Sequence, residues 1–169
     1  MSIISMAFNG KRGLLPVDLI FVLIIFITVL SMFVMIGYTL TSTMKDNLDT
    51  SGDYNTSSLD DAMDAYKMFN TGIPFIFFGF VIISIILAIS LKTSPAVSIV
   101  MFFIIAVIGY IAQSISNMMF DFTRNSAITD AANEMGYVVY LQDNLPLFIL
   151  IIGLVITIFM FAKPKSYDV

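Results

Sequence analysis

The side chains of this sequence that could do chemistry are its carboxylates, and most of them gather in two stretches. Residues 41–72 and 120–144 hold ten of the twelve Asp and Glu residues. Carboxylate oxygens are ligands that Ca²⁺ prefers, but residues 49–53 do not complete a calcium-binding loop. Gly52 stands at the fourth position of that stretch instead of the sixth, and no Glu closes it. The pattern therefore predicts two solvated acidic surfaces and no metal site.

The chain contains no His and no Cys, which removes the commonest general base and the commonest metal ligands. Catalysis would depend on a carboxylate with a shifted pKa, such as Asp121 or Asp143, and no pattern indicates one. The sequence has no Gly-rich phosphate loop, no nucleophile paired with a base and no basic patch for nucleic acid. We expect a protein that is not an enzyme, uses no cofactor and binds no nucleic acid.

The composition indicates that lipid is the solvent of this chain. Of its 169 residues 59% are hydrophobic and 12% are charged, and the mean hydropathy is +0.96. Soluble domains carry about 25% charged residues, so this chain cannot cover a soluble surface. The length corresponds to one domain, residues 1–169.

Four segments are long and apolar enough to cross a bilayer, which requires about 20 residues of helix. They are residues 17–40, 73–91, 96–118 and 145–162, separated by outer loops at 41–72 and 120–144 and by a tight turn near Pro95. Backbone polar groups in hydrocarbon must bond within their own segment, so each span is expected to be helical. The predicted fold is therefore all-α, a polytopic integral membrane protein with four transmembrane helices.

The basic residues set the predicted orientation through the positive-inside rule. Five of the eight lie on one side of the four spans: Lys11, Arg12, Lys92, Lys163 and Lys165. The two long connections hold the other three and most of the acids. We therefore place both termini on the inner side of a cell or virion membrane and the acidic loops outside.

Both outer loops are expected to carry short amphipathic helices. Apolar residues recur at helical spacing in each loop. Gly72 and Pro74 are predicted to end the first helix before the second span begins. Acidic polar faces favour packing of these helices on each other or on a partner over binding to lipid headgroups. The apolar residues are Leu59, Ala62, Met63, Tyr66 and Phe69 in the first loop, and Ile128, Ala132, Met135 and Val139 in the second.

Small and polar residues within the spans are candidates for the bundle interior. Small residues let helices approach, and hydroxyls and amides bond across their interfaces. A water-lined path is the functional alternative, but the spans contain no ionisable residue of the kind that pumps and proton-coupled carriers require. Gln113 is the most polar of the set. The candidates are Thr28, Ser31, Tyr38, Ser84, Ala88, Tyr110, Gln113, Asn117, Gly153 and Thr157.

The N-terminal stretch Lys11-Arg12-Gly13, followed by Asp18 and an apolar helix, resembles the leader of type IV prepilins over about 25 residues. The resemblance implies cleavage after Gly13. Three further spans and an Asp in place of the usual Glu depart from the prepilin pattern. The other interpretation is an inner-leaflet anchor, in which Pro16 starts the first span and Asp18 lies near its positive end.

Two functions follow as expectations. The first is a structural or scaffolding protein of a larger membrane assembly, either an accessory subunit of a membrane complex or a membrane protein of a lipid-containing virion. Its partners would be the bilayer and other membrane subunits or copies of itself. The alternative is a small oligomeric channel or holin-like pore, because pores without charged residues can gate by dewetting.

Overall fold

The computed structural model describes residues 16–52, 55–90 and 95–162. This part of the chain is helical, with no β-strand in it. The all-α prediction is confirmed for these residues. The elements are α2 (Pro16–Ser51), α3 (Ser57–Ser90), α4 (Pro95–Thr123), α5 (Thr129–Glu134), α6 (Gly136–Asp143) and α7 (Leu145–Phe161).

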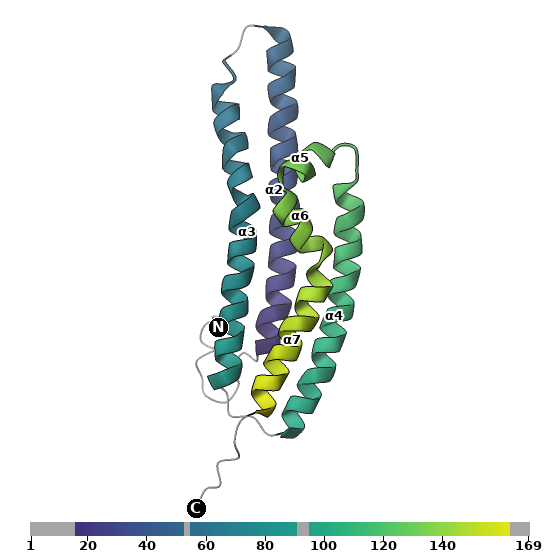
Figure 1. Ribbon diagram of the computed structural model, residues 1–169. Helices are drawn as coiled ribbons and strands as arrows, with labels where there is room; N and C mark the ends of the chain where they lie inside the picture. The colour runs from purple at the N-terminus through teal and green to yellow at the C-terminus, as the bar shows by residue number, and fades with distance from the viewer. Residues whose placement is uncertain (1–15, 53–54, 91–94, 163–169) are drawn as a thin grey trace, which may run out of the picture.

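The long helices form an up-and-down bundle (Figure 1). The start of α2 and the end of α7 lie at the same end of this bundle, and α5 and α6 lie toward the other. Helix α2 packs mainly on α3, while α4 packs mainly on α7. The short helix α5 rests on α2, and α6 lies against α3 and α4.

Three helices, α2, α3 and α4, are each long and apolar enough to cross a membrane. The fourth predicted span is different, because α6 and α7 reach the required length only as a pair that is bent by 62°. Helix α7 alone has 17 residues, about 26 Å, slightly less than the ~30 Å of a hydrocarbon core. The chain thus has three helices of spanning length, or four if the bent pair counts as one.

The core is built from apolar stripes with a spacing of three and four residues. Helix α3 buries Ile73, Phe77, Val81, Ser84 and Ala88, which is the spacing of helices packed with a small crossing angle. Comparable stripes run along the facing sides of the other long helices. They include Ile20, Ile24, Ile27 and Met35 of α2, Met101, Ile105, Ile108 and Ala112 of α4, and Leu145, Ile149, Ile156 and Met160 of α7.

Residues 41–72 are not the loop with a separate short helix that the sequence predicted. Helix α2 continues to Ser51 and α3 begins at Ser57, with Pro74 inside it. Two helices that pack side by side can continue through residues of weak propensity, because tertiary contact supplies most helical stability. Residues 45–51 and 55–67 therefore form a projecting helical hairpin, which we call the arm (Figure 1).

The side chains of the arm are at most partly buried. None of its residues with a described side chain is fully buried. Polar contacts join the two helices near the tip, where Lys45 bonds Asp60 and the Thr56 hydroxyl donates to the Asp49 carboxylate at 3.0 Å. From Ser57 to Lys67 helix α3 rises about 15 Å, and Lys67 is level with Glu134 of α5, which it approaches at 3.7 Å.

The second outer connection folds back onto the bundle as two short helices, α5 and α6, instead of one. We call residues 129–143 the cap. The helices are interrupted at Met135, where the backbone leaves the helical conformation before Gly136. Six cap residues are buried: Ala131, Ala132, Met135, Val138, Leu141 and Gln142.

Candidate functional site

The most polar buried group of the described structure is Gln142, at the end of the cap. Its side chain is 0% exposed. The amide nitrogen donates to the Ser31 hydroxyl at 3.1 Å. The amide oxygen faces the Thr28 hydroxyl at 3.4 Å. Residues from α2 and α6, more than a hundred positions apart, thus meet in one polar cluster.

The two hydroxyls of this cluster are hydrogen-bonded within α2, and the cluster holds no ionisable group. The Ser31 hydroxyl donates to the Ile27 carbonyl at 2.7 Å, which leaves its oxygen free to accept from Gln142. The Thr28 hydroxyl makes its shorter bond, 2.8 Å, to the Ile24 carbonyl. Buried amides and hydroxyls with partners fix one packing arrangement. The cluster can therefore fasten α6 to α2, but it provides no proton relay.

A second polar fastening holds the start of α6. The Asn70 side-chain oxygen, on α3, accepts hydrogen bonds from the backbone N–H groups of Tyr137 at 2.8 Å and Val138 at 3.3 Å. The first N–H groups of a helix lack partners within it. Helix α6 has no side-chain cap of its own. Asn70 takes that role from a neighbouring helix, four residues before Pro74.

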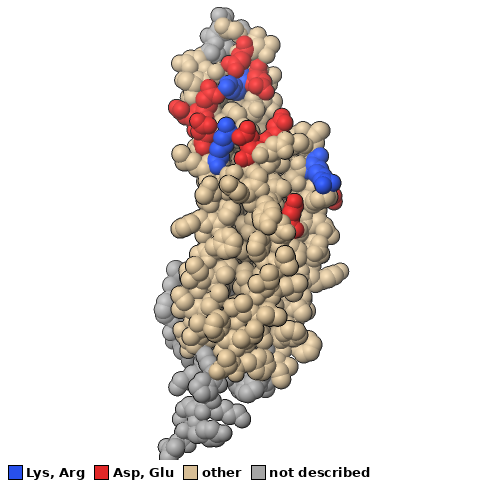
Figure 2. Space-filling view, viewed as in Figure 1, with Lys and Arg blue, Asp and Glu red and all other residues tan. Residues whose placement is uncertain are grey.

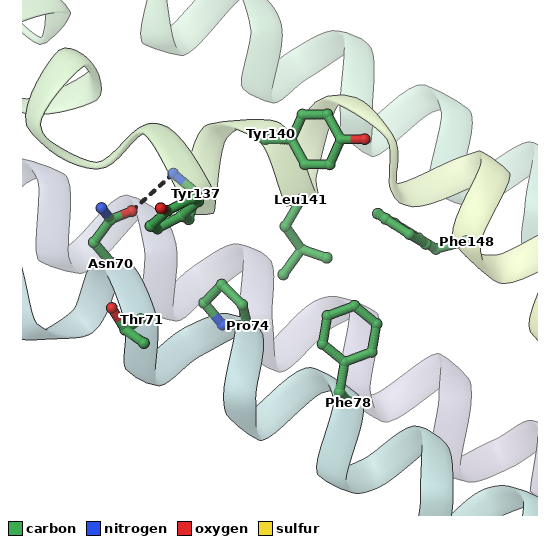
Figure 3. A pocket seen from close by; sticks show the side chains of 8 residues that line it. All are labelled: Asn70, Thr71, Pro74, Phe78, Tyr137, Tyr140, Leu141 and Phe148. Atoms are coloured by element: carbon green, nitrogen blue, oxygen red, sulfur yellow. Dashed lines mark hydrogen bonds between the residues drawn. The ribbon is translucent and has the colours of Figure 1, made fainter.

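A groove lies between α3, α6 and α7, next to Asn70 (Figure 3). Its volume is about 220 Å³, and its walls expose almost only carbon. Asn70, Thr71 and Tyr137 stand at one end, and Phe78 and Phe148 stand at the other. The remaining lining residues are Pro74, Tyr140 and Leu141. A concave site with apolar walls and a few polar groups at one end suits an amphiphilic molecule.

The structure divides the ten interior candidates into two sets. Thr28, Ser31, Tyr38, Ser84, Ala88, Gly153 and Thr157 are buried between helices. Tyr110, Gln113 and Asn117 are not interior residues but lie exposed on α4, where the Gln113 amide donates to Asn117 at 2.9 Å. The reason is the phase of the helix. Helix α4 turns Ile108, Ala112 and Ser116 inward, which places these three side chains on the outer face.

Gly153 marks a close approach of α4 and α7. A Cβ atom at this position would overlap the Ile105 side chain of α4. Thr157, one turn later, bonds its own helix at the Gly153 carbonyl, at 2.8 Å. The pair therefore serves close packing, with no polar contact across the interface.

The sequence reasoning missed Gln142 and Asn70. A signal for Gln142 existed, since it stands in register with the apolar residues Val138 and Leu145 and is the polar member of that stripe. Asn70 carried no comparable signal, because nothing local indicates that α6 starts beside it. The five basic residues on which the predicted orientation rests lie outside the described residues, as does the prepilin-like Lys11-Arg12-Gly13; the five are Lys11, Arg12, Lys92, Lys163 and Lys165.

Among the described residues, the charged side chains visible in Figure 2 gather at the arm and cap end. Lys45 and Lys67 both pair with carboxylates there, and the Arg124 guanidinium lies 3.6 Å from the centre of the Phe120 ring. Within residues 16–52, 55–90 and 95–162 no three Asp or Glu side chains come together as a metal site.

Comparison with family models, with curated proteins and with solved structures gave no match to this chain. Its function is therefore inferred from its own residues.

Proposed function

We propose that this chain is a non-enzymatic structural protein of a membrane, which spans the bilayer and helps to hold a larger membrane assembly together. The assembly is a membrane complex with this chain as accessory subunit, or the membrane of a lipid-containing virion. In this proposal both termini lie on the inner side, the arm projects outside, and the cap packs on the bundle toward the outer face of the membrane. The observation that carries it is the arm, which projects beyond the rest of the fold.

The chemistry of the arm supports a protein partner. Asp46, Asp49 and Asp61 are exposed on it, while Met68 at its base is 75% exposed. A projecting pair of helices that buries little of its own surface has side chains available for a second protein. The acidic groups would steer a basic partner toward the apolar residues at the base.

The test is purification from native membranes in mild detergent, followed by identification of the proteins that remain bound. We expect a defined set of partner subunits. Asp46→Asn with Asp61→Asn on the arm should weaken that association, mainly at low salt. Asp121→Asn with Asp130→Asn is the matched control, because it removes two exposed acids elsewhere and should leave the association intact. Isolation of the chain without any partner would refute the proposal.

The exposed polar face of α4 favours a second candidate function, a small oligomeric channel or holin-like pore. Tyr110 is 76% exposed, and Gln113 and Asn117 follow it on the same face. Polar residues of a membrane helix usually face protein or water. In a ring of copies this face would line a lumen. Conductance of reconstituted chains that falls with Gln113→Leu would support the pore, and silent bilayers at high protein density would exclude it.

A further inference from the structure

We propose that the groove between α3, α6 and α7 binds one phospholipid of the outer leaflet, with an acyl chain along its apolar walls and an amine-bearing headgroup at its polar end. This inference rests on the membrane insertion contained in the proposed function and is independent of the scaffolding role. Three observations carry it, namely the depth of the groove, the direction of its polarity and the charge beside its mouth.

The groove lies at the depth of the outer-leaflet hydrocarbon. Lys67 is the last charged residue along α3, and the 21 residues from Asn70 to Ser90 carry no charge. That stretch is about 31 Å long, which matches a hydrocarbon core of ~30 Å. Asn70 therefore stands near the outer end of this charge-free stretch, and Phe78 stands about 12 Å further along it.

The polarity of the groove changes along the same direction. Beside the mouth of the groove, the Thr71 and Tyr137 hydroxyls and the Asn70 amide nitrogen have no hydrogen-bond partner among the described residues, so they are available to the ester and phosphate oxygens of a lipid. Deeper in, Pro74, Leu141 and the rings of Phe78 and Phe148 enclose the space (Figure 3). Water finds no polar partner at such walls, whereas a hydrocarbon chain packs against them.

The charges above the mouth select the headgroup. Lys67 already lies between two carboxylates, at 3.6 Å from Asp64 and 3.7 Å from Glu134. These three side chains together carry a net negative charge. A lipid with an ammonium group, such as phosphatidylcholine, meets favourable carboxylates there, while an anionic headgroup meets repulsion. Exposed pairs of this kind contribute little, so we expect a preference of only about threefold.

The experiment uses the full chain in lipid nanodiscs that contain a photoactivatable phosphatidylcholine or phosphatidylglycerol with the same diazirine-bearing acyl chain. Labelled residues are mapped by mass spectrometry. We expect labels to concentrate in residues 71–78 and 137–148, with about threefold more from phosphatidylcholine. Asp64→Asn combined with Glu134→Gln should remove that preference, because Lys67 then stands without a carboxylate partner.

Two matched variants distinguish lipid bound in the groove from lipid that contacts the rest of α3. Thr71→Phe fills the mouth from an exposed position, and labelling of residues 137–148 should fall about fivefold, which corresponds to about 1 kcal/mol. Ile82→Phe places the same ring at another exposed position of α3 that does not line the groove, and the labelling should not change.

Two results would overturn the proposal: labels spread evenly over every exposed helix face, or a preference of the unmodified chain for phosphatidylglycerol. Labels around Ile82 report membrane insertion itself. A chain that is labelled nowhere has not inserted, and that result refutes both this inference and the proposed function. Absence of partner proteins in the purification refutes the scaffolding role alone and does not contradict the proposed lipid site.

Discussion

The arm and the cap are both acidic connections on the same side of the bundle, yet they fold in opposite ways. The arm continues two long helices away from the bundle and contains no fully buried residue among its described side chains. The cap turns back and buries six. Net charge does not distinguish them. The difference lies in the apolar pattern, because the arm has one stripe for a single partner helix. The cap instead has Met135, Val138 and Gln142 facing the bundle, and its helices break at Met135 and Asn144.

A helical bundle can thus hold a connecting segment in two ways. The cap is held by burial and by hydrogen bonds that it donates to Asn70 and Ser31, so its position is fixed by the bundle. The arm is held by the continuity of α2 and α3 and by surface polar contacts, so its tip depends little on the bundle. Four experiments examine that contrast, in order of decreasing effect.

The largest effect is expected from truncating matched methionines. Met135 is 0% exposed in the cap, and Met135→Ala should lower the free energy of unfolding by about 3 kcal/mol. Met63 is only partly buried in the arm, and Met63→Ala should cost about 1 kcal/mol. Reversible unfolding in mixed micelles measures both. Equal losses would show that the arm is packed as firmly as the cap.

Asn70→Ala should remove the fastening at the start of α6. Loss of a helix cap costs about 1 kcal/mol. Because the lost bonds are those to the N–H groups of Tyr137 and Val138, hydrogen exchange should accelerate at these two amides. Exchange at residues 57–63 of the arm serves as the internal control and should stay unchanged. Faster exchange in both regions would mean that the arm and the cap are coupled after all.

Gln142→Leu tests the deeper fastening. Hydrogen bonds between helices in a membrane contribute about 0.6 kcal/mol on average, and Leu occupies similar space. A double-mutant cycle with Ser31→Ala isolates the interaction from the change in packing. We expect a coupling energy of about 0.6 kcal/mol. Strict additivity of the two substitutions would contradict the hydrogen bond at 3.1 Å.

The smallest effect concerns the ion pair of the arm. The hydrogen bond with Asp60 raises the pKa of Lys45 above its ordinary value of 10.5, and the charges of Asp60, Asp49 and Asp46 act in the same direction. A raised pKa means that the folded arm holds this proton more tightly than the unfolded chain does. The contribution is thus complete below pH 10.5 and is lost as the pH rises through the higher folded value.

Cleavage of the arm by an alkaline-active protease, followed across that pH range, measures the loss. The unmodified arm should become more susceptible as Lys45 deprotonates. In Lys45→Met the step attributable to this pair should be absent. A step of equal size in the variant would assign the pH dependence to other groups.

Much of the fold could be predicted from the sequence, because a helix that crosses hydrocarbon must be long and free of charged residues. The all-helical class and α2, α3 and α4 as helices of spanning length follow from that requirement alone. The arm was not predicted, since Gly72 and Pro74 are local breakers in isolation. Asn70 precedes Pro74 by four residues, so its carbonyl loses the usual helical partner, yet packing on α2 keeps the helix continuous.

The candidate site was harder to predict from the sequence, because it depends on which distant elements meet. Thr28 and Ser31 were predicted as interior polar residues, and their position on α2 is enough for that prediction. Their partner Gln142 lies in a segment that looked like an outer loop, and only the bend between α6 and α7 brings it inside. Gln113 shows the reverse error, since its polarity alone could not reveal the outward phase of α4.

The unbroken course of α2 has a mechanical consequence. From Pro16 to Ser51 it contains no proline after its first residue and one glycine, Gly37, against which the Tyr66 ring lies. Helix α3 instead lacks one backbone hydrogen bond at Pro74 and is more compliant there. A force on the arm tip would therefore be transmitted along the stiff helix α2 as far as Ser31. Helix α3 would instead bend at Pro74, beside the groove.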